Sequence, residues 1–177
     1  MITHPLLTRL ANKGIRLGYE ELALFLDAIV PGRGSLCAVQ IAGTNGKGSV
    51  SRMLESIYLN AGYSVGLFTS PHLSDVNERI RINGEDISDT QFDDLITQLS
   101  SLAVEWSTRR ASVEDSQDLT APLTYFEMTT AMAVVAFYSA EVDVAIFEVG
   151  LGGRLAATNV INPVATAVVT VDYDHQD

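Results

Sequence analysis

The sequence predicts an α/β domain with a mostly parallel sheet and helices on both faces. Short runs that are apolar throughout alternate with segments whose apolar residues recur at helical spacing, which is the order of a β-α-β fold. The length of 177 residues suits one domain. The apolar content of 47%, with 19% charged residues, is that of a globular protein and argues against disorder.

The first part of the chain predicts two helices and two buried strands. Residues 20–30 have apolar side chains at helical spacing and two glutamates in the first turn, where negative charge favours a helix. Residues 36–42 and 64–69 are apolar runs typical of buried parallel strands. Residues 47–61 predict a helix that ends at Gly62, a C-cap glycine. The apolar face of that helix consists of Val50, Met53, Leu54, Ile57 and Ala61.

A hairpin is expected next. Within residues 71–87, Ile80 and Ile82 alternate with Arg79 and Arg81, and an Asn-Gly dipeptide, a strong hairpin-turn signal, follows directly. We expect this hairpin to be a small excursion on the surface.

A capping box introduces the following helix. Ser88 is followed three residues later by Gln91, and an apolar stripe begins directly afterwards. The stripe consists of Phe92, Leu95, Ile96, Leu99, Leu102 and Trp106. Residues 107–121 are polar and unpatterned, so we expect a mobile loop there.

One more helix and two β-rich runs complete the chain. Thr124 and Glu127 have capping-box spacing for a helix that ends near Ser139. Strands are expected at residues 144–149 and 165–171. No helix is predicted after the last strand, so either the chain is a fragment or another chain covers the sheet.

Charge and cysteine content narrow the function classes. Twenty-two acidic residues against eleven Lys and Arg give a net charge of −11, which disfavours broad binding to nucleic acid or anionic membranes. A single cysteine, Cys37, excludes an internal disulfide and fits a reducing compartment. No segment approaches the ~20 apolar residues of a membrane span, and the N-terminus lacks the pattern of a secretory signal. We expect a cytoplasmic protein without nucleic-acid or membrane partners.

The sharpest motif is AGTNGKGS at residues 42–49, between a predicted strand and a predicted helix. Phosphate binding needs inward-pointing backbone N–H groups, glycines where a Cβ would collide, and the positive end of a helix. Lys47 can bind the β- and γ-phosphates of a nucleotide, and Ser49 can reach a phosphate-bound Mg²⁺. Gly48 separates these two residues, so the strict Walker pattern is not met, and a plain glycine-rich turn is the alternative. The candidate nucleotide-binding residues are Gly43, Thr44, Asn45, Gly46, Lys47, Gly48 and Ser49.

Further candidates follow other strands, whose carboxyl ends face the ligand crevice of an open α/β sheet. Glu148 could hold Mg²⁺, or could be a strand-end carboxylate paired with a basic residue. Ser70 could be a ligand or a turn former. His175 could reach the same edge, although imidazole is an unusual magnesium ligand and a solvated histidine is the alternative. Tyr125 and Phe126 could be core aromatics or a wall for a flat heterocycle.

Together these motifs resemble the folylpolyglutamate synthases and dihydrofolate synthases, folate-branch relatives of the Mur ligases. The motifs are AGTNGKGS, LFTSPHL with NERIRINGEDIS, LTYFE, FEVGLGGRLAATNV and DYDH, and the resemblance runs from about Ile15 to the C-terminus. It implies a P-loop NTPase-like Mur ligase ATPase domain that uses ATP and Mg²⁺. It also implies an amide ligase, in which the γ-phosphoryl group moves to a folate or dihydropteroate carboxylate. The amine of L-glutamate then attacks the acyl phosphate.

The resemblance also implies roles for individual residues. Thr44 to Lys47 would bind the ATP phosphates, and Lys47, Glu148 and His175 would form the catalytic centre. The implied magnesium ligands are Ser49, Ser70, Glu148 and His175. The implied pteroate-binding residues are Ile15, Arg16, Leu17, Leu123, Thr124, Tyr125, Phe126, Leu155, Ala156 and Ala157.

The chain departs from the family pattern in two ways. The family usually has Asp at the position of Ala156, and a lost charged hydrogen bond to the pterin is worth about 1.5–3 kcal/mol. The family chain also continues well beyond Asp177 into a C-terminal glutamate-binding domain. We therefore expect residues 1–177 to be the N-terminal portion of the ATP-binding domain. This portion should bind nucleotide weakly and turn over little, and the full-length enzyme should be a monomer.

Two other functions remain open at this point. A different P-loop enzyme, such as a kinase or nucleotidase, would transfer phosphate to a hydroxyl or to water without needing glutamate. A non-catalytic nucleotide- or folate-binding module descended from the ligase is the other alternative. Glutamate dependence of ATP consumption separates the first from the ligase, and the length of the reading frame bears on the second. The choice between dihydropteroate and a reduced folate is also open.

Overall fold

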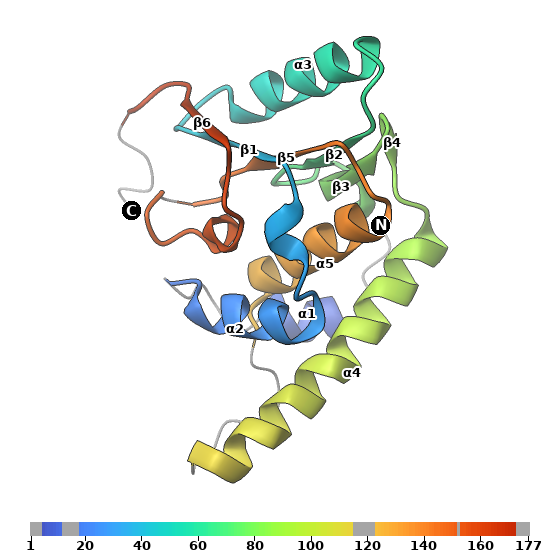
Figure 1. Cartoon of the computed structure of the whole chain (residues 1–177), viewed down its shortest axis with the longest axis vertical. Coiled ribbons are helices and arrows are strands. Elements are labelled where there is room, and N and C mark those ends of the chain that lie inside the picture. Colours follow the sequence, from blue (N-terminus) through green and yellow to red (C-terminus); the bar gives the residue numbers. More distant parts are fainter. Residues whose placement is uncertain (1–4, 12–17, 115–122, 152, 173–177) are drawn as a thin grey trace.

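The computed structural model describes residues 5–11, 18–114, 123–151 and 153–172. In this part of the chain a six-stranded sheet has the order β4-β3-β2-β5-β1-β6 (Figure 1). In chain order the strands are β1 (Ala38–Ala42), β2 (Val65–Phe68), β3 (Ile80–Ile82), β4 (Glu85–Asp86), β5 (Val144–Glu148) and β6 (Ala165–Val168). Strands β2, β5, β1 and β6 run parallel to one another. Strand β3 pairs antiparallel with β2, and β4 pairs antiparallel with β3.

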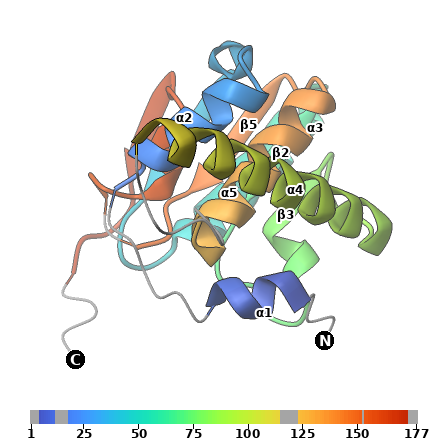
Figure 2. The same cartoon turned by 90° about the horizontal axis from the view of Figure 1, so that it is seen from below.

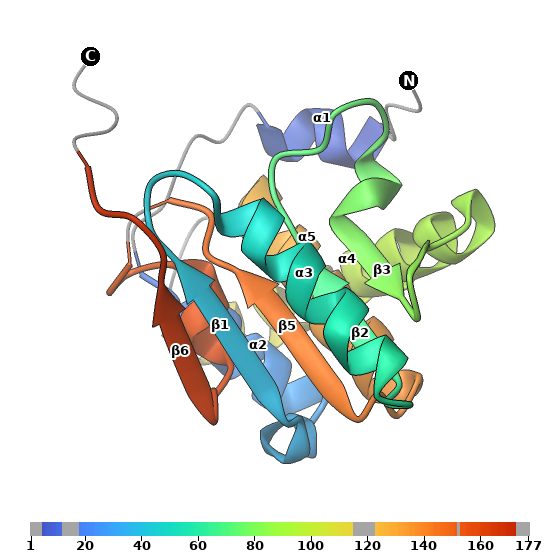
Figure 3. The same cartoon turned by 90° about the horizontal axis from the view of Figure 1, so that it is seen from above.

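Helices cover both faces of the sheet, so the expected fold class is confirmed. They are α1 (Pro5–Ala11), α2 (Glu20–Ile29), α3 (Lys47–Asn60), α4 (Asp89–Glu114) and α5 (Tyr125–Ser139). Helix α3 lies alone on one face in the view of Figure 3. Helices α5, α2 and α4 lie on the other face, where Figure 2 shows them in front of the sheet, and α1 lies to one side in contact with α5. Short 3-10 turns at Arg33–Ser35, Val76–Arg79 and Ala157–Val160 complete the described elements.

The larger apolar core lies between the sheet and α5. Phe147 of β5 meets Phe137 of α5 and Phe68 of β2 with ring centroids 5.5 and 6.0 Å apart. A Cβ at Gly66 would lie 2.5 Å from the Phe137 ring, so a glycine in β2 lets α5 approach the sheet closely. The smaller core on the opposite face contains Val39, Ile41, Val65, Leu67, Val144 and Ile146, covered by α3.

The helix starts expected from capping boxes are confirmed. Before α4, the Ser88 N–H donates to Gln91 Oε1 at 2.9 Å, and the Gln91 N–H donates to Ser88 Oγ at 3.2 Å. Before α5, the Thr124 N–H donates to Glu127 Oε2 at 2.7 Å, and the Glu127 N–H donates to Thr124 Oγ1 at 3.3 Å. Each pair satisfies donors that a helix start leaves without intrahelical partners.

The expected apolar face of α3 was wrong in part. Met53 and Ile57 are 63% and 62% exposed, whereas Leu54 packs on the smaller core. The buried side of the helix includes Glu55, which is 4% exposed and pairs with Arg81 of β3 at 3.2 Å. Because this ion pair requires Glu55 to face inward, and successive helix residues are rotated by ~100°, Met53 and Ile57 face the solvent.

Three other expectations from the sequence were also wrong. The hairpin is no surface excursion, because β3 pairs with β2 and Ile80 is fully buried. Helix α4 continues through residues 107–114, where we expected a loop, and residues 115–122 lie outside the described part. Strand β6 ends at Val168, short of the expected Val171: the Val169 N–H still donates to Ala42 of β1, but Thr170 bonds the loop before α3 instead of β1.

Among the helices of the described residues, none combines the length and the hydropathy of a membrane-spanning segment.

Candidate active site

The loop between β1 and α3 has the backbone geometry that the phosphate-loop motif predicts. Gly43 and Gly46 have φ of +132° and +86°, in the region that favours glycine. A Cβ at Gly43 would also lie 2.7 Å from the Thr170 carbonyl oxygen. Helix α3 begins at Lys47, so the first-turn N–H groups and the positive end of its dipole face the loop.

The side chain of Lys47 lies over this loop. Its Nζ donates to the carbonyl oxygens of Gly43 and Thr44 at 2.8 and 3.0 Å. The segment after β6 holds the other side of the loop: the Thr44 N–H donates to the Thr170 carbonyl at 2.7 Å, and the Asn45 N–H donates to Thr170 Oγ1 at 3.0 Å. The backbone donors of Thr44 and Asn45 thus already have partners, and the N–H groups of α3's first turn are the ones that face outward.

Glu148 ends β5 beside the start of α3. The Ser70 N–H donates to Glu148 Oε2 at 3.1 Å, and a Cβ at Gly48 would lie 3.5 Å from the same oxygen. Glu148 is 5% exposed. Burial raises the pKa of Glu148, whereas the Ser70 hydrogen bond and the charges of Lys47 and Arg79 lower it. The structure therefore brings Lys47, Ser70 and Glu148 together at one edge of the sheet.

The donors at this edge suit a magnesium ion. The described residues hold no group of three or more His, Cys, Asp or Glu that could bind a metal. Mg²⁺ commonly takes one or two carboxylates, with water and phosphate oxygens in the other positions. One carboxylate, Glu148, beside Ser70 and the start of α3 fits that preference, and Ser49 follows Gly48 in the first turn of this helix. His175 lies outside the described residues.

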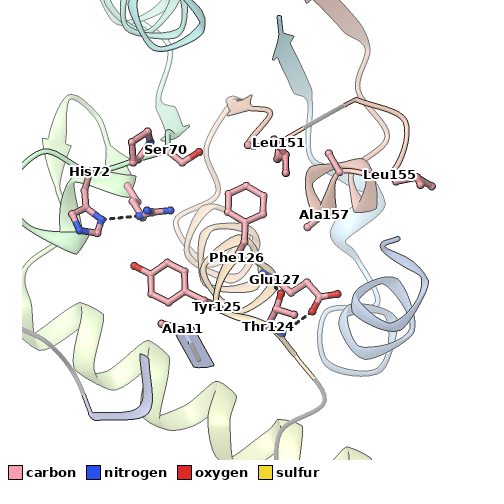
Figure 4. A pocket seen from close by; sticks show the side chains of 14 residues that line it. Ala11, Ser70, His72, Thr124, Tyr125, Phe126, Glu127, Leu151, Leu155 and Ala157 are labelled. Atoms are coloured by element: carbon pink, nitrogen blue, oxygen red, sulfur yellow. Dashed lines mark hydrogen bonds between the residues drawn. The ribbon is translucent and has the colours of Figure 1, made fainter. Parts of the chain in front are cut away.

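A cavity of about 560 Å³ opens beside this edge. In Figure 4, His72 and Ser70 lie on one side of it, Leu155 and Ala157 on the opposite side, and Phe126 between them. Tyr125 and Phe126 begin α5 and supply aromatic surface. Ser70 lines the cavity and also binds Glu148 through its N–H, so it joins the cavity to the strand-end site.

Most of the described candidates for pteroate binding line this cavity. They are Thr124, Tyr125, Phe126, Leu155, Ala156 and Ala157. Leu123 is fully buried and is not among the lining residues. Ile15, Arg16 and Leu17 lie outside the described residues.

Two lining residues, Arg79 and His72, were missed by the sequence reasoning. Arg79 is 8% exposed, its Nε donates to His72 Nδ1 at 2.9 Å, and its guanidinium lies 5.2 Å from the centre of the Tyr125 ring. Burial lowers the pKa of Arg79, and the charges of Tyr125 and Glu148 oppose this. The alternation of Ile and Arg in this segment indicated an outward side chain, and no local signal shows that Arg79 points inward.

Known proteins match the chain along most of its length. A probable bifunctional folylpolyglutamate synthase/dihydropteroate synthase of Halobacterium salinarum is 49% identical over 139 residues, which is 78% of this chain and 16% of that protein. The dihydrofolate synthase/folylpolyglutamate synthase of Escherichia coli is 36% identical over 171 residues, 97% of this chain and 37% of that protein. No family model matches the chain.

Solved structures agree with these sequences. Mycobacterium tuberculosis folylpolyglutamate synthase complexed with ADP superposes with a TM-score of 0.84 at 33% identity, over 97% of this chain and 37% of that one. E. coli FolC in complex with DHPP and ADP gives 0.80 at 36% identity, over 96% and 38%. The resemblance to folylpolyglutamate and dihydrofolate synthases is confirmed.

The chain covers only part of the length of each relative, so the matches establish its fold. The chain spans 16% and 37% of the lengths of the two curated relatives described above. The fold of a folylpolyglutamate synthase over the matched part is therefore shown, in agreement with the predicted sheet and helices. The substrates and the activity of the complete relatives can only be proposed for this chain.

Proposed function

We propose that the chain is part of an ATP-dependent amide ligase. The ligase joins L-glutamate to the carboxylate of a folate or of dihydropteroate through an acyl phosphate. One observation carries this proposal: the loop before α3 and the Glu148 carboxylate lie next to an apolar, aromatic cavity, and Ser70 belongs to both. A phosphoryl donor and a flat carboxylic acid bound in these places would meet beside Ser70.

The phosphate half of the site relies on backbone donors and one cation. The outward-facing N–H groups of α3's first turn would bind the nucleotide phosphates, as helix N-termini bind anions in general. Lys47 is held over the loop by two carbonyl oxygens and can turn to the β- and γ-phosphates without moving the backbone. Gly48 lies next to Glu148 at the same helix start.

Glu148, with Ser49 and Ser70, would hold the magnesium ion. When bound, the ion neutralises charge on the transferring phosphoryl group. A related folylpolyglutamate synthase/dihydrofolate synthase structure contains Mn, AMPPNP and L-glutamate, at 35% identity and a TM-score of 0.80. Burial raises the pKa of Glu148, and the positive charges near it lower the pKa. A bound cation would add positive charge and lower the pKa further, so the carboxylate would stay ionised.

The cavity would bind the pteridine and benzoate parts of the second substrate. Tyr125 and Phe126 can stack on a flat ring system, and stacking adds about 0.5–1.5 kcal/mol beyond burial for aromatic pairs. Ala156, 4% exposed and on the cavity wall, offers no hydrogen bond to a pterin. Dihydropteroate and the reduced folates carry the same pterin, so we propose that the cavity binds either of them mainly through the two aromatic rings.

We further propose that residues 1–177 are the N-terminal portion of the ATP-binding domain of a monomeric, cytoplasmic enzyme. The share of the relatives' lengths that the chain covers supports the first part. The single cysteine supports a reducing compartment. Size-exclusion chromatography of the complete enzyme tests the monomer.

Calorimetry tests the nucleotide half of this proposal. Mg²⁺–ATP is titrated into the chain and into Lys47→Ala, and we expect the variant to bind at least about tenfold more weakly, because a charged hydrogen bond is worth about 1.5–3 kcal/mol. Arg109→Ala removes an exposed cation on α4 and serves as the charge control. Equal affinity of wild type and Lys47→Ala contradicts the phosphate-loop assignment.

The second titration separates the ligase from a kinase or nucleotidase. Tetrahydrofolate is added to the chain in the presence and absence of the ATP analogue AMPPCP. Binding that is lost in Tyr125→Ala supports the pteroate cavity. Nucleotide binding without tetrahydrofolate binding favours the other phosphotransferases.

A further inference from the structure

Arg79 is a buried cation without an assigned role in the proposed reaction. It is 8% exposed and lines the cavity. The ion pairs of the described residues lie elsewhere, and none of them joins Arg79 to a carboxylate. A buried charge without a paired countercharge costs several kcal/mol, about 3–5 kcal/mol where one partner of a buried pair has been removed. Such a residue in a cavity is a candidate for binding an anion.

The hydrogen bond to His72 fixes the direction of the Arg79 side chain. Arg79 Nε donates to His72 Nδ1 at 2.9 Å, the contact drawn as a dashed line from His72 in Figure 4. A ring nitrogen that accepts must carry a lone pair, so this contact requires the neutral imidazole. Within the described residues, Nε is the guanidinium nitrogen that makes a hydrogen bond, which leaves the two terminal nitrogens for a ligand.

The surroundings place this cation at the reactive end of the cavity. The centre of the Tyr125 ring lies 5.2 Å from the Arg79 guanidinium, and the negative charge of Glu148 raises the pKa of Arg79. Ser70 lines the same cavity and bonds Glu148. The opposite side, around Leu155 and Ala157, is apolar (Figure 4).

We propose that Arg79 binds the substrate carboxylate that the ligase activates, and that the hydrogen bond to His72 positions Arg79 for this contact. The inference rests on the proposed function and adds the group that orients the acyl acceptor. A guanidinium binds a carboxylate through two parallel hydrogen bonds, so it fixes both the position and the plane of the reacting group. The same charge also lowers the repulsion between the carboxylate and the γ-phosphate, two anions that must approach each other.

The competing explanation is purely structural. In this explanation, Arg79 serves only to brace the segment between β2 and β3 internally, through His72, and to hold that segment against α5, through the Tyr125 ring. In that case its replacement lowers stability without changing which ligands the cavity prefers. The preference for a carboxylate over a neutral amide is therefore the decisive readout.

The test compares dihydropteroate with its carboxamide, which has the same shape without the charge. Both are titrated into the wild-type chain, Arg79→Lys, Arg79→Gln and Arg154→Gln by calorimetry. Arg154 is an exposed arginine on the loop before Leu155, so it controls for the loss of one positive charge near the cavity. We expect the wild type to bind the carboxylate about ten- to a hundredfold more tightly than the amide. Arg79→Gln should lose this preference, Arg79→Lys should keep part of it, and Arg154→Gln should keep it in full.

The outcomes separate this inference from the proposed function. If neither ligand binds the wild type, the pteroate cavity and the role of Arg79 are both overturned. If the wild type binds both ligands equally, or if Arg154→Gln loses the preference as Arg79→Gln does, only the role of Arg79 is overturned. Should Arg79→Gln be unfolded by circular dichroism, the wild-type ratio and Arg79→Lys still decide.

A pair of variants tests the positioning role of His72. His72→Asn retains an acceptor oxygen for Arg79 Nε, whereas His72→Leu removes it. We expect His72→Asn to keep most of the carboxylate preference and His72→Leu to reduce it about tenfold. Equal preferences in the two variants overturn the positioning role.

Discussion

Gly43 occupies a backbone position that other residues fill only with strain. Its φ is +132°, and a Cβ would lie 2.7 Å from the Thr170 carbonyl oxygen. We expect Gly43→Ala to lower the free energy of unfolding by about 1–3 kcal/mol and to weaken nucleotide binding, since the loop must move away from Thr170. Gly34→Ala is the control, because nothing lies within 4 Å of its added Cβ. Urea denaturation that gives both variants the same stability contradicts this.

Ala156 tests the proposed binding of a pterin in the cavity. Because it is 4% exposed on the cavity wall, Ala156→Asp would place a carboxylate against the ligand. We expect Ala156→Asp to bind dihydropteroate about ten- to a hundredfold more tightly, through a charged hydrogen bond, and to be less stable when empty. Ala156→Asn separates charge from shape. If calorimetry gives the alanine, asparagine and aspartate proteins one affinity, the prediction is wrong.

At the scale of elements, the two capping boxes allow a matched comparison. Ser88 caps α4 away from the cavity, whereas Thr124 caps α5 and lines the cavity. Ser88→Ala and Thr124→Ala should each cost about 0.5–2 kcal/mol of stability, the usual effect of removing an N-cap. Only Thr124→Ala should also weaken tetrahydrofolate binding. Equal loss of binding in both variants would mean that stability, and not contact, controls affinity.

The turn that connects β2 to β3 depends on one carboxylate. The N–H groups of Leu73, Ser74 and Asp75 donate to Glu78 at 2.8, 2.9 and 2.9 Å, and these bonds lower the pKa of Glu78 to about 2. A group whose pKa falls on folding stabilises the fold above its unfolded pKa, and that contribution is lost as pH falls toward the folded value. We therefore expect the wild type to lose more stability than Glu78→Gln between pH 5 and pH 2, a range set by the ordinary glutamate pKa of 4.5 and the lowered pKa of about 2. Thermal unfolding across this range measures it, and parallel curves would refute it.

The elements also show which features sequence could predict. The caps of α4 and α5 and the glycine that closes α3 were foreseen, because each depends on residues within one helical turn. The inward side of α3 could not be foreseen, because it depends on Glu55 meeting Arg81 of β3. The end of α4 was missed for a related reason: Trp106 and Arg110 contact each other, and Arg110 binds Glu21 of α2, so polar residues there join other elements.

Across the whole molecule, the phosphate loop links segments that are distant from one another in the sequence. It joins β1 to α3 and is bonded to the segment after β6. A ligand there should therefore stabilise the fold as one unit. At Mg²⁺–ATP a hundredfold above its dissociation constant, linkage gives about 2.7 kcal/mol and a rise of about 5–10 °C in Tm for a chain of this length. At the same Mg²⁺–ATP concentration, a variant Lys47→Ala that binds about tenfold more weakly should gain about 1.4 kcal/mol, roughly half of this rise, and an equal rise in the variant would contradict the loop assignment.

By itself, the sequence determined the fold class, most strand positions, the helix caps and the glycine loop between β1 and α3. These features depend on periodicity and turn chemistry within a few residues. Only the tertiary structure decided that Arg79 points into a cavity, that Thr170 holds the loop, and that Ser70 links Glu148 to the aromatic wall. The physical reason is that a buried polar side chain is stabilised by partners distant in the sequence, and no local pattern records those partners.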